Sequence, residues 1–330
     1  MTWLAAYLYY SEPWESFLGE SLAPFVQRVL KDGIAERYFF IRYWEQGPHV
    51  RLRFFGDEAV LEHTLKPLLE KHFKAYFEQH PSTRVEPEWL KTAPTEQQWF
   101  PNNSIQYIPY EQETERYGGP QAVTVGEVQF ESSSNAILAA IRQSESWTYE
   151  RALGIAIQMH LSFAYALGMD ANETAEFYSY IFSSWLPMAY NGYARQLNKE
   201  EHIQQQEEIV QVFDKQFVAQ EKTLVEFHQI ILEALQEGEI FEEAWLNDWI
   251  TEMKQIYADL LLLDRHGLVQ FPKRYAISSN NKTPEDRQKF WAIYASYVHM
   301  TNNRLGIQNR DEGYLAYLIM KSLEQVGVVK

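Results

Sequence analysis

RYFFIRYWEQGPHVRLRFF, residues 37–55, is the stretch that decides the fold of the first third of the chain. Arg37 to Trp44 and His49 to Phe55 are rich in aromatic and branched residues, which favour β-strands. Between them, Glu45-Gln46-Gly47-Pro48 has the composition of a turn. We therefore predict a β-hairpin.

The second strand of this hairpin carries a row of basic side chains. Side chains alternate between the two faces of a strand, so His49, Arg51 and Arg53 share one face. If a four-residue loop pairs Trp44 with His49, Arg42 lies opposite Arg51, which destabilises the sheet unless an anion lies between the two charges. Arginine suits bidentate capture of carboxylates and phosphates. We predict an anion site here; the alternative is a solvated basic face that protects the strand from aggregation.

The flanking sequence extends the hairpin into a layer. We predict strands at Thr2 to Tyr10 and Ser104 to Tyr110, and helices at Trp14 to Leu30 and Val60 to Phe77. The order strand, helix, strand, strand, helix, strand is typical of a ferredoxin-like antiparallel sheet with helices on one face. The proline-rich residues 82–103 are predicted to be an inserted surface loop.

The rest of the chain has helical periodicity. We predict an α+β fold in which residues 1–119 form the sheet-containing part with the basic face and residues 120–330 form a helical part. The two are expected to make one compact enzyme unit with its site at the junction. Helices are predicted at about 133–144, 147–167, 170–190, 200–237, 240–265, 284–304 and 310–327.

Composition excludes several classes of function. The chain has 29 Lys and Arg against 45 Asp and Glu, a net charge of −16, which argues against direct binding of nucleic acid. It has no cysteine, so disulfides, thiolate metal sites and thiol catalysis are excluded, and the histidine spacings predict no metal site. No apolar run reaches the ~18 residues of a membrane span, and the N-terminus lacks a signal peptide's basic region. A cytoplasmic protein is the default expectation.

A charged segment precedes an unusual turn at the start of the helical part. Glu113 and Arg116 stand just before Gly118-Gly119-Pro120. Two glycines before a proline predict an unusual backbone path, which could hold these charged side chains at an interface. The alternative interpretation is a domain linker with a charged surface.

His299 lies on the helix predicted over residues 284–304, which Thr283 is expected to cap. Ala295 and Ser296 lie one turn earlier on the same face, so there is room beside the imidazole. A lone helical histidine is more often a surface or core residue than a catalytic one. The spacing by itself leaves both interpretations open.

These motifs resemble the C-terminal domain of class I lantibiotic dehydratases, which is shared with thiopeptide-type bacteriocin biosynthesis proteins. The resemblance covers nearly the whole chain and rests on four separated motifs in the same order. These are Trp3, Phe39-Phe40-Ile41-Arg42-Tyr43 with Pro48-His49-Val50-Arg51-Leu52-Arg53-Phe54, Glu113 with Arg116-Tyr117-Gly118-Gly119, and His299 with Asn303-Arg304-Leu305. The large N-terminal glutamylation domain of the family is missing, so the resemblance implies a stand-alone version.

The resemblance implies a carbon–oxygen lyase that removes glutamate from glutamylated Ser or Thr of a precursor peptide and leaves dehydroalanine or dehydrobutyrine. Arg51, Arg53 and Arg116 match the arginines expected to clamp glutamyl carboxylates. His299 matches the proton-transferring histidine, and Glu113 matches an acidic residue near the arginines. Which of the last two takes the proton is left open.

Five further positions are implied to bind substrate or to shape the site. They are Arg42, His49, Tyr117, Asn303 and Arg304. The implied partners are the ribosomally made precursor peptide and a separate protein that transfers glutamate from glutamyl-tRNA. A cyclase partner and homodimerisation are left open, and no cofactor is required.

Two alternatives remain. Members of the same family include thiopeptide pyridine synthases, which join two dehydroalanines by a formal aza-[4+2] cycloaddition and then lose water and the leader peptide. The arginine, glutamate and histidine set favours elimination, because cycloaddition has no glutamyl group to clamp. The third hypothesis is a non-catalytic subunit that docks the precursor peptide, for which the polar motif residues would be unnecessary.

Overall fold

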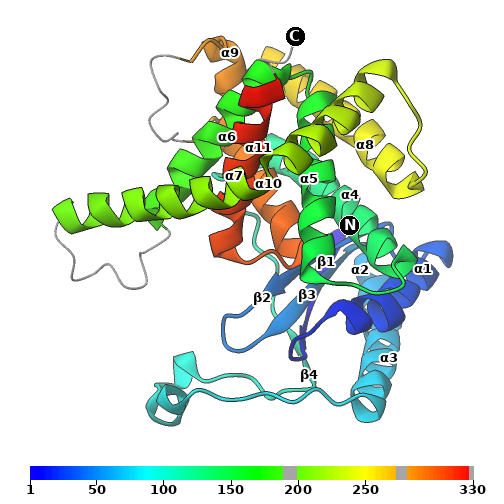
Figure 1. The fold of residues 1–330 in the computed structure, drawn as a ribbon. Coiled ribbons are helices and arrows are strands. Elements are labelled where there is room, and N and C mark those ends of the chain that lie inside the picture. The colour runs from blue at the N-terminus through cyan, green and yellow to red at the C-terminus, as the bar shows by residue number, and fades with distance from the viewer. Residues whose placement is uncertain (189–198, 273–280, 327–330) are drawn as a thin grey trace. The chain divides into compact units, whose positions relative to one another are not determined.

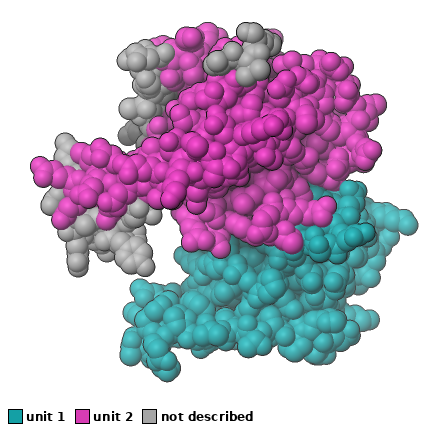
Figure 2. Space-filling view, in the orientation of Figure 1, with its two compact units in different colours: residues 1–112, 130–147 teal, residues 113–129, 148–330 magenta. Residues whose placement is uncertain are grey.

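The computed structural model describes residues 1–188, 199–272 and 281–326. They form two compact units, coloured separately in Figure 2. Unit 1 comprises residues 1–112 and 130–147, and unit 2 comprises residues 113–129 and 148–330. The predicted ends of two helices, at residues 190 and 327, lie outside the described residues.

Unit 1 is built on a four-stranded antiparallel sheet in the order β2-β3-β1-β4 (Figure 1). This is the order of the predicted ferredoxin-like layer, and it confirms the α+β fold class. The strands are β1 (Thr2–Tyr9), β2 (Arg37–Tyr43), β3 (His49–Gly56) and β4 (Ser104–Tyr107).

Helices cover the sheet face that carries the apolar side chains of β3. Phe54 meets Phe25 of α1 edge to face, with 6.1 Å between ring centroids, and Phe25 lies 5.1 Å from Phe73 of α3. This packing explains why the apolar and basic residues alternate along β3. The helical segments are η1 (Phe17–Leu22), α1 (Ala23–Lys31), α2 (Glu58–Val60), η2 (Leu61–Leu65) and α3 (Lys66–Gln79), and the insertion holds η3 (Glu88–Thr92) and η4 (Thr95–Gln97).

The predicted hairpin is confirmed, but its predicted register is wrong by one residue. Tyr43 pairs with His49, so Arg42 lies opposite Val50 and Ile41 lies opposite Arg51. The loop is longer than predicted because it contains two residues with left-handed backbone, Gln46 at φ 57° and Gly47 at φ 108°. A shift of one residue moves a side chain to the other face of the sheet, so Arg42 lies on the opposite face from Arg51.

The helix α4 (Gly119–Gln143) begins well before the predicted start at residue 133 and contributes to both units. Its C-terminal part lies along β2 in unit 1: the Phe40 amide donates to Ser134 Oγ at 3.2 Å, and the Tyr38 hydroxyl donates to Asn135 Oδ1 at 2.7 Å. Residues 130–147 therefore pack with the sheet. The predicted domain boundary at residue 119 stays a prediction, because α4 belongs partly to each of the two compact units.

Unit 2 is helical, as predicted. Thr148 and Asp170 cap α5 and α6 by accepting backbone hydrogen bonds. Thr283 does not cap as predicted: its hydroxyl donates to Glu176, and the predicted helix is broken into α9 and α10. The helices are α5 (Tyr149–Ala166), α6 (Ala171–Trp185), η5 (Leu186–Met188), α7 (Lys199–Glu237), α8 (Ala244–Arg265), α9 (Glu285–Gln288), α10 (Trp291–Leu305) and α11 (Asn309–Val326). Among the described residues, no helix is both long and apolar enough to cross a membrane.

Three histidines are buried as neutral side chains. Burial lowers the pKa of His49, His160 and His228 from 6.5 to about 4 in each case. When the pH falls from about 6.5 toward 4, the unfolded chain binds protons that the folded chain does not bind. The free energy of unfolding therefore falls over this range, by up to ~3 kcal/mol for each histidine.

We expect His228→Leu to make the pH dependence of stability shallower between pH 7 and 4. His228 is chosen because its Nδ1 contacts only the Leu224 carbonyl of its own helix, at 2.7 Å. Denaturant unfolding at several pH values measures the slope of the free energy of unfolding against pH. His266→Leu, at an exposed position, is the matched control for the loss of a histidine. An identical slope for both variants would contradict the assignment.

Candidate functional site

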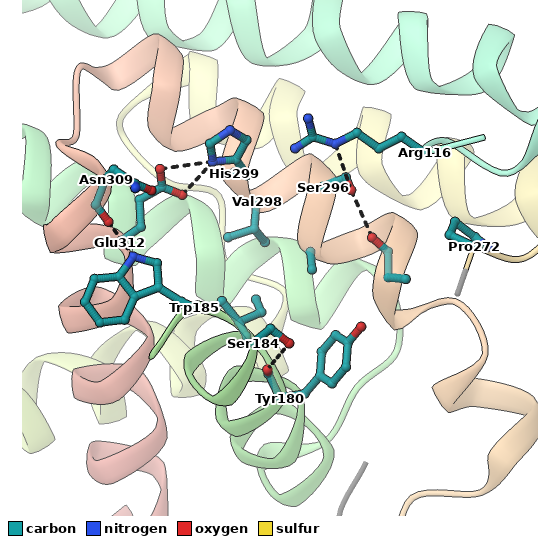
Figure 3. A pocket seen from close by; sticks show the side chains of 13 residues that line it. Arg116, Tyr180, Ser184, Trp185, Pro272, Ser296, Val298, His299, Asn309 and Glu312 are labelled. Atoms are coloured by element: carbon teal, nitrogen blue, oxygen red, sulfur yellow. Dashed lines mark hydrogen bonds and ion pairs between the residues drawn. The ribbon is translucent and has the colours of Figure 1, made fainter. Parts of the chain in front are cut away.

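A cavity of about 480 Å³ lies in unit 2 (Figure 3). Helices α6, α10 and α11 form its walls, together with Arg116 and Pro272. Its other lining residues are Tyr180, Ile181, Ser184 and Trp185 of α6, Ala292, Ala295, Ser296, Val298 and His299 of α10, and Asn309 and Glu312 of α11. Two polar groups named by the sequence motifs, Arg116 and His299, thus line one cavity.

His299 is held by a carboxylate from the neighbouring helix. Its Nδ1 lies 3.0 Å and 2.9 Å from the two carboxylate oxygens of Glu312, and Figure 3 shows the two side chains pointing toward each other. A carboxylate accepts hydrogen bonds, so Nδ1 carries a proton, and in the neutral form of the ring the lone pair is on Nε2. Nε2 is then the atom that can take a proton from a substrate.

Arg116 is fixed by the same helix as His299. Its Nε donates to Ser296 Oγ at 3.3 Å, and the Ser296 hydroxyl donates to the carbonyl of Ala292 at 3.0 Å (Figure 3). Glu113, with an exposed side chain, accepts from Arg116 Nη1 at 3.4 Å and does not line the cavity. An exposed pair of this kind contributes little stability, so the contact with Ser296 orients the guanidinium.

The glycine pair before Pro120 has the unusual backbone that its sequence predicts. Gly118 and Gly119 have φ of 90° and 95°, a region that favours glycine. A methyl group built on Gly118 would lie 2.8 Å from Cδ1 of Ile293, on the helix that carries His299. The turn therefore lets the Arg116 segment approach α10 closely.

The apolar wall of the cavity depends on a second close approach. Trp185 packs against Gly313 of α11, and its indole Nε1 donates to the Asn309 carbonyl at 2.6 Å. A methyl group built on Gly313 would overlap the Trp185 ring. Gly313 thus permits the contact between α6 and α11 that closes this side of the cavity.

Gly313→Ala is expected to destabilise the protein by about 1–3 kcal/mol, because the indole must move out of a packed position. Gly154→Ala is the matched control: it changes a helix interior where an added methyl group meets nothing within 4 Å, and it should stabilise by ~0.5–1 kcal/mol. Denaturant unfolding measures both. Equal effects of the two substitutions would contradict the role of Gly313.

Three other predicted positions of unit 2 do not line this cavity. Tyr117 is buried and stacks on Tyr297, with ring centroids 5.9 Å apart and planes 13° apart. Arg304 is buried and donates from Nη1 to the Met300 carbonyl at 2.8 Å, and the Asn303 carbonyl accepts from Gly306 at the end of α10. These contacts support the helix, and substrate binding by the three residues stays a prediction.

In unit 1, Arg51 lies between two aromatic rings on the sheet face opposite the helices. Its guanidinium carbon lies 3.5 Å from the centroid of the Tyr43 ring and 4.5 Å from that of Tyr7. Its Nε donates to His49 Nε2 at 3.0 Å, and its Nη2 donates to Glu45 at 3.3 Å. The side chain is therefore held in one orientation on the sheet.

His49 is a hydrogen-bond acceptor for Arg51. Burial lowers the pKa of His49 to about 4, so its ring is neutral near pH 7. Its Nδ1 donates to the Gly47 carbonyl at 2.8 Å, which leaves Nε2 to accept from Arg51. These contacts orient Arg51, and the predicted role of His49 in substrate binding stays a prediction.

We expect His49→Gln to keep more activity than His49→Phe, because glutamine can offer an amide oxygen to Arg51 and phenylalanine cannot. The difference should be about 10-fold in kcat/KM, by analogy with the lower end of effects seen for residues that orient metal-ligating side chains. Steady-state kinetics of the two variants measures the difference. Equal activity of the two variants would show that the acceptor is unimportant.

Two further arginines of the hairpin, Arg42 and Arg53, are more buried than Arg51. Arg53 shares the face of Arg51 and lies over the rings of Tyr110 and Phe39, at 4.2 Å and 5.1 Å. Arg42 is 3% exposed, lies on the helix-facing side and donates from Nη1 to Glu15 at 2.7 Å. The predicted opposition of Arg42 and Arg51 is therefore wrong. Arg42 joins the sheet to the segment before α1.

Residues 3–323 match the family described as the C-terminal domain of lantibiotic biosynthesis dehydratases. The chain belongs to this family. The match covers all four motifs and confirms the resemblance stated from them. Within unit 2 these motifs supply Arg116 and His299 to one cavity, and within unit 1 they supply His49, Arg51 and Arg53 to one face of the sheet.

Individual relatives are distant. The subtilin biosynthesis protein SpaB of Bacillus subtilis is 29% identical over 141 residues, which cover 42% of this chain and 12% of that protein. The pyridine synthase TbtD from thiomuracin biosynthesis has the same fold, with a TM-score of 0.73, 15% identity and full coverage of both chains. TsrL has a TM-score of 0.66 at 17% identity, covering 99% of this chain and 95% of its own.

The tRNA-dependent lantibiotic dehydratase MibB from Microbispora sp. 107891 contains the same fold as part of a longer chain. The TM-score is 0.58 at 17% identity, and the match covers 99% of this chain and 28% of MibB. The chain thus spans only a fraction of two of these relatives. At such identities the solved structures establish the fold.

Sequence reasoning missed Glu312, Trp185 and Gly313. Glu312 follows His299 by 13 residues and lies on the next helix, so no helical periodicity links the two. Its only sequence signal is an acidic residue in the first turn of a helix, which is common for electrostatic reasons. Among the described residues, no group of three or more His, Asp or Glu side chains is placed to hold a metal ion.

Proposed function

We propose that this protein is a lyase that eliminates glutamate from glutamylated Ser and Thr side chains of a ribosomally made precursor peptide. The proposal rests on one observation. Arg116 lines the same cavity as His299, whose Nδ1 is hydrogen-bonded to the Glu312 carboxylate. This elimination requires two groups. One is a cation that binds a carboxylate, and the other is an imidazole with a free lone pair. Family membership supports the same reaction.

The proposed reaction is a β-elimination. His299 Nε2 takes the Cα proton of the esterified residue, and the C–H electron pair forms the Cα=Cβ double bond. The Cβ–O bond breaks, and its electron pair leaves on the carboxylate of glutamate. The products are dehydroalanine or dehydrobutyrine, free glutamate and a protonated imidazole, which Glu312 stabilises as an ion pair.

Arg116 is proposed to bind the carboxylate of the departing glutamate. Its Nη groups can offer a bidentate contact while Nε stays on Ser296. Arg51 and Arg53 stay proposed carboxylate ligands, and Glu113 stays the alternative base. Transfer of glutamate from glutamyl-tRNA is proposed to be the work of a different catalytic unit.

The apolar wall of the cavity favours one second candidate. Tyr180, Ile181 and Trp185 offer a surface on which dehydroalanines and azoles could pack, so formal aza-[4+2] cycloaddition with loss of water and leader peptide is the alternative. Arg116 and the His299–Glu312 pair favour elimination, because cycloaddition releases no carboxylate.

The deciding experiment gives the purified protein two synthetic peptides and follows both by mass spectrometry. The first carries glutamyl-Ser, and the second carries preformed dehydroalanines and azoles. Loss of glutamate from the first with a dehydrated product supports the proposal. Cyclisation of the second with release of the leader peptide supports the alternative instead, and tight binding of either peptide without turnover supports a docking subunit.

A further inference from the structure

The cavity histidine is connected to a second, fully buried histidine by an uninterrupted chain of hydrogen bonds. The chain runs from His299 to Glu312, then to Asn302 and then to His160. It joins three helices, since His160 lies on α5, Asn302 and His299 lie on α10, and Glu312 lies on α11. The sequence motifs named neither Asn302 nor His160 as functional.

Each link has a defined donor. Glu312 Oε2 lies 3.4 Å from Asn302 Nδ2, and a carboxylate only accepts, so the amide nitrogen faces Glu312. The amide oxygen of Asn302 must then face His160, whose Nε2 lies 2.8 Å away. His160 therefore donates from Nε2. The opposite orientation of the amide would point two acceptors at each other.

The inner end of this chain is buried and uncharged. His160 and Asn302 are each 1% exposed, and burial lowers the pKa of His160 to about 4, so its ring is neutral near pH 7. The Tyr178 hydroxyl donates to the His160 backbone carbonyl at 3.3 Å, which ties α5 to α6. Buried polar groups of this kind are costly to leave without partners, so the chain holds its members in place.

We propose that Asn302 and His160 are positioning residues that fix the Glu312 carboxylate and thereby keep His299 in its Nδ1–H tautomer, with Nε2 turned to the cavity. Neither residue lines the cavity, so they act through Glu312. Their effect on turnover rests on the proposed function. Their effect on the tautomer of His299 does not.

The test is a histidine tautomer measurement by NMR on protein labelled with nitrogen-15 in histidine. Long-range proton–nitrogen correlations distinguish the two tautomers, and His299→Gln and His160→Gln assign the two signals. We expect Nδ1–H for His299 and Nε2–H for His160. Either signal in the other tautomer overturns the proposal.

Asn302→Leu removes both hydrogen bonds while keeping a side chain of similar size. We expect His299 to become a mixture of tautomers and kcat to fall about 10–100-fold with KM little changed. Asn172→Leu, at an exposed position of α6, is the matched control and should leave both readouts as in the wild type. A folded Asn302→Leu protein with an unchanged His299 signal would overturn the proposal.

The inner histidine offers a rescue pair if Asn302→Leu fails to fold. His160→Gln keeps an N–H donor for Asn302 and should keep the His299 tautomer, whereas His160→Leu loses the donor and should not. Equal signals in these two variants would overturn the proposal. If the expected tautomers are seen but glutamyl peptide is not consumed, the hydrogen-bond chain stands and the proposed reaction fails.

Discussion

Replacing His299 with alanine is expected to lower kcat for glutamate elimination by about 10²–10⁴-fold, the usual contribution of a positioned general base. The imidazole is 41% exposed on the cavity side while its Nδ1 is bound by Glu312, so its loss removes a proton acceptor and little packing. Glutamylated peptide should accumulate, and mass spectrometry measures it directly.

The control is His266→Ala, which removes an exposed histidine just after α8 in the same unit. It should leave kcat and the unfolding transition unchanged. If His299→Ala eliminates glutamate at the wild-type rate, the proton acceptor is another group, and Glu113→Gln is the next variant to test.

Replacing Arg116 with alanine should lower kcat/KM about 10²–10³-fold, the range for removal of one group that stabilises developing negative charge. The leaving carboxylate would lose its cation inside the cavity. Arg116→Lys should restore only part of the activity, because lysine keeps the charge but loses the planar fork and the Nε donor to Ser296.

Arg265→Ala removes an exposed arginine at the end of α8 and serves as the control for Arg116. Steady-state kinetics on the glutamylated peptide compares the three variants. Full activity in Arg116→Lys would mean that charge alone matters, and full activity in Arg116→Ala would remove Arg116 from the site.

The site could be predicted from sequence only in part, and the arginines show where the limit lies. The alternation of β3 is a local property, so it correctly placed His49, Arg51 and Arg53 on one face. The position of Arg42 depends on the loop, where Gln46 and Gly47 both take left-handed backbone. That conformation added one residue to the loop and moved Arg42 to the other face.

The partner of His299 illustrates the same limit in the helical unit. Helical periodicity predicted the helix and the small residues beside His299, because a 3.6-residue repeat is visible along the chain. Glu312 reaches His299 from α11, a helix that also packs against α6 where Gly313 meets Trp185. No local pattern encodes such a contact between helices.

The sequence by itself determined the α+β class, the hairpin at residues 37–55, and the shared face of His49, Arg51 and Arg53. It also determined the family, through motifs that stand in a fixed order. Strand alternation, helical periodicity and turn composition are short-range properties, which is why they can be read without a structure. The tertiary structure alone decided the register of Arg42, the pairing of His299 with Glu312 and the hydrogen-bond chain to His160. These depend on packing between residues distant in sequence, where backbone path and side-chain volume fix which polar groups meet.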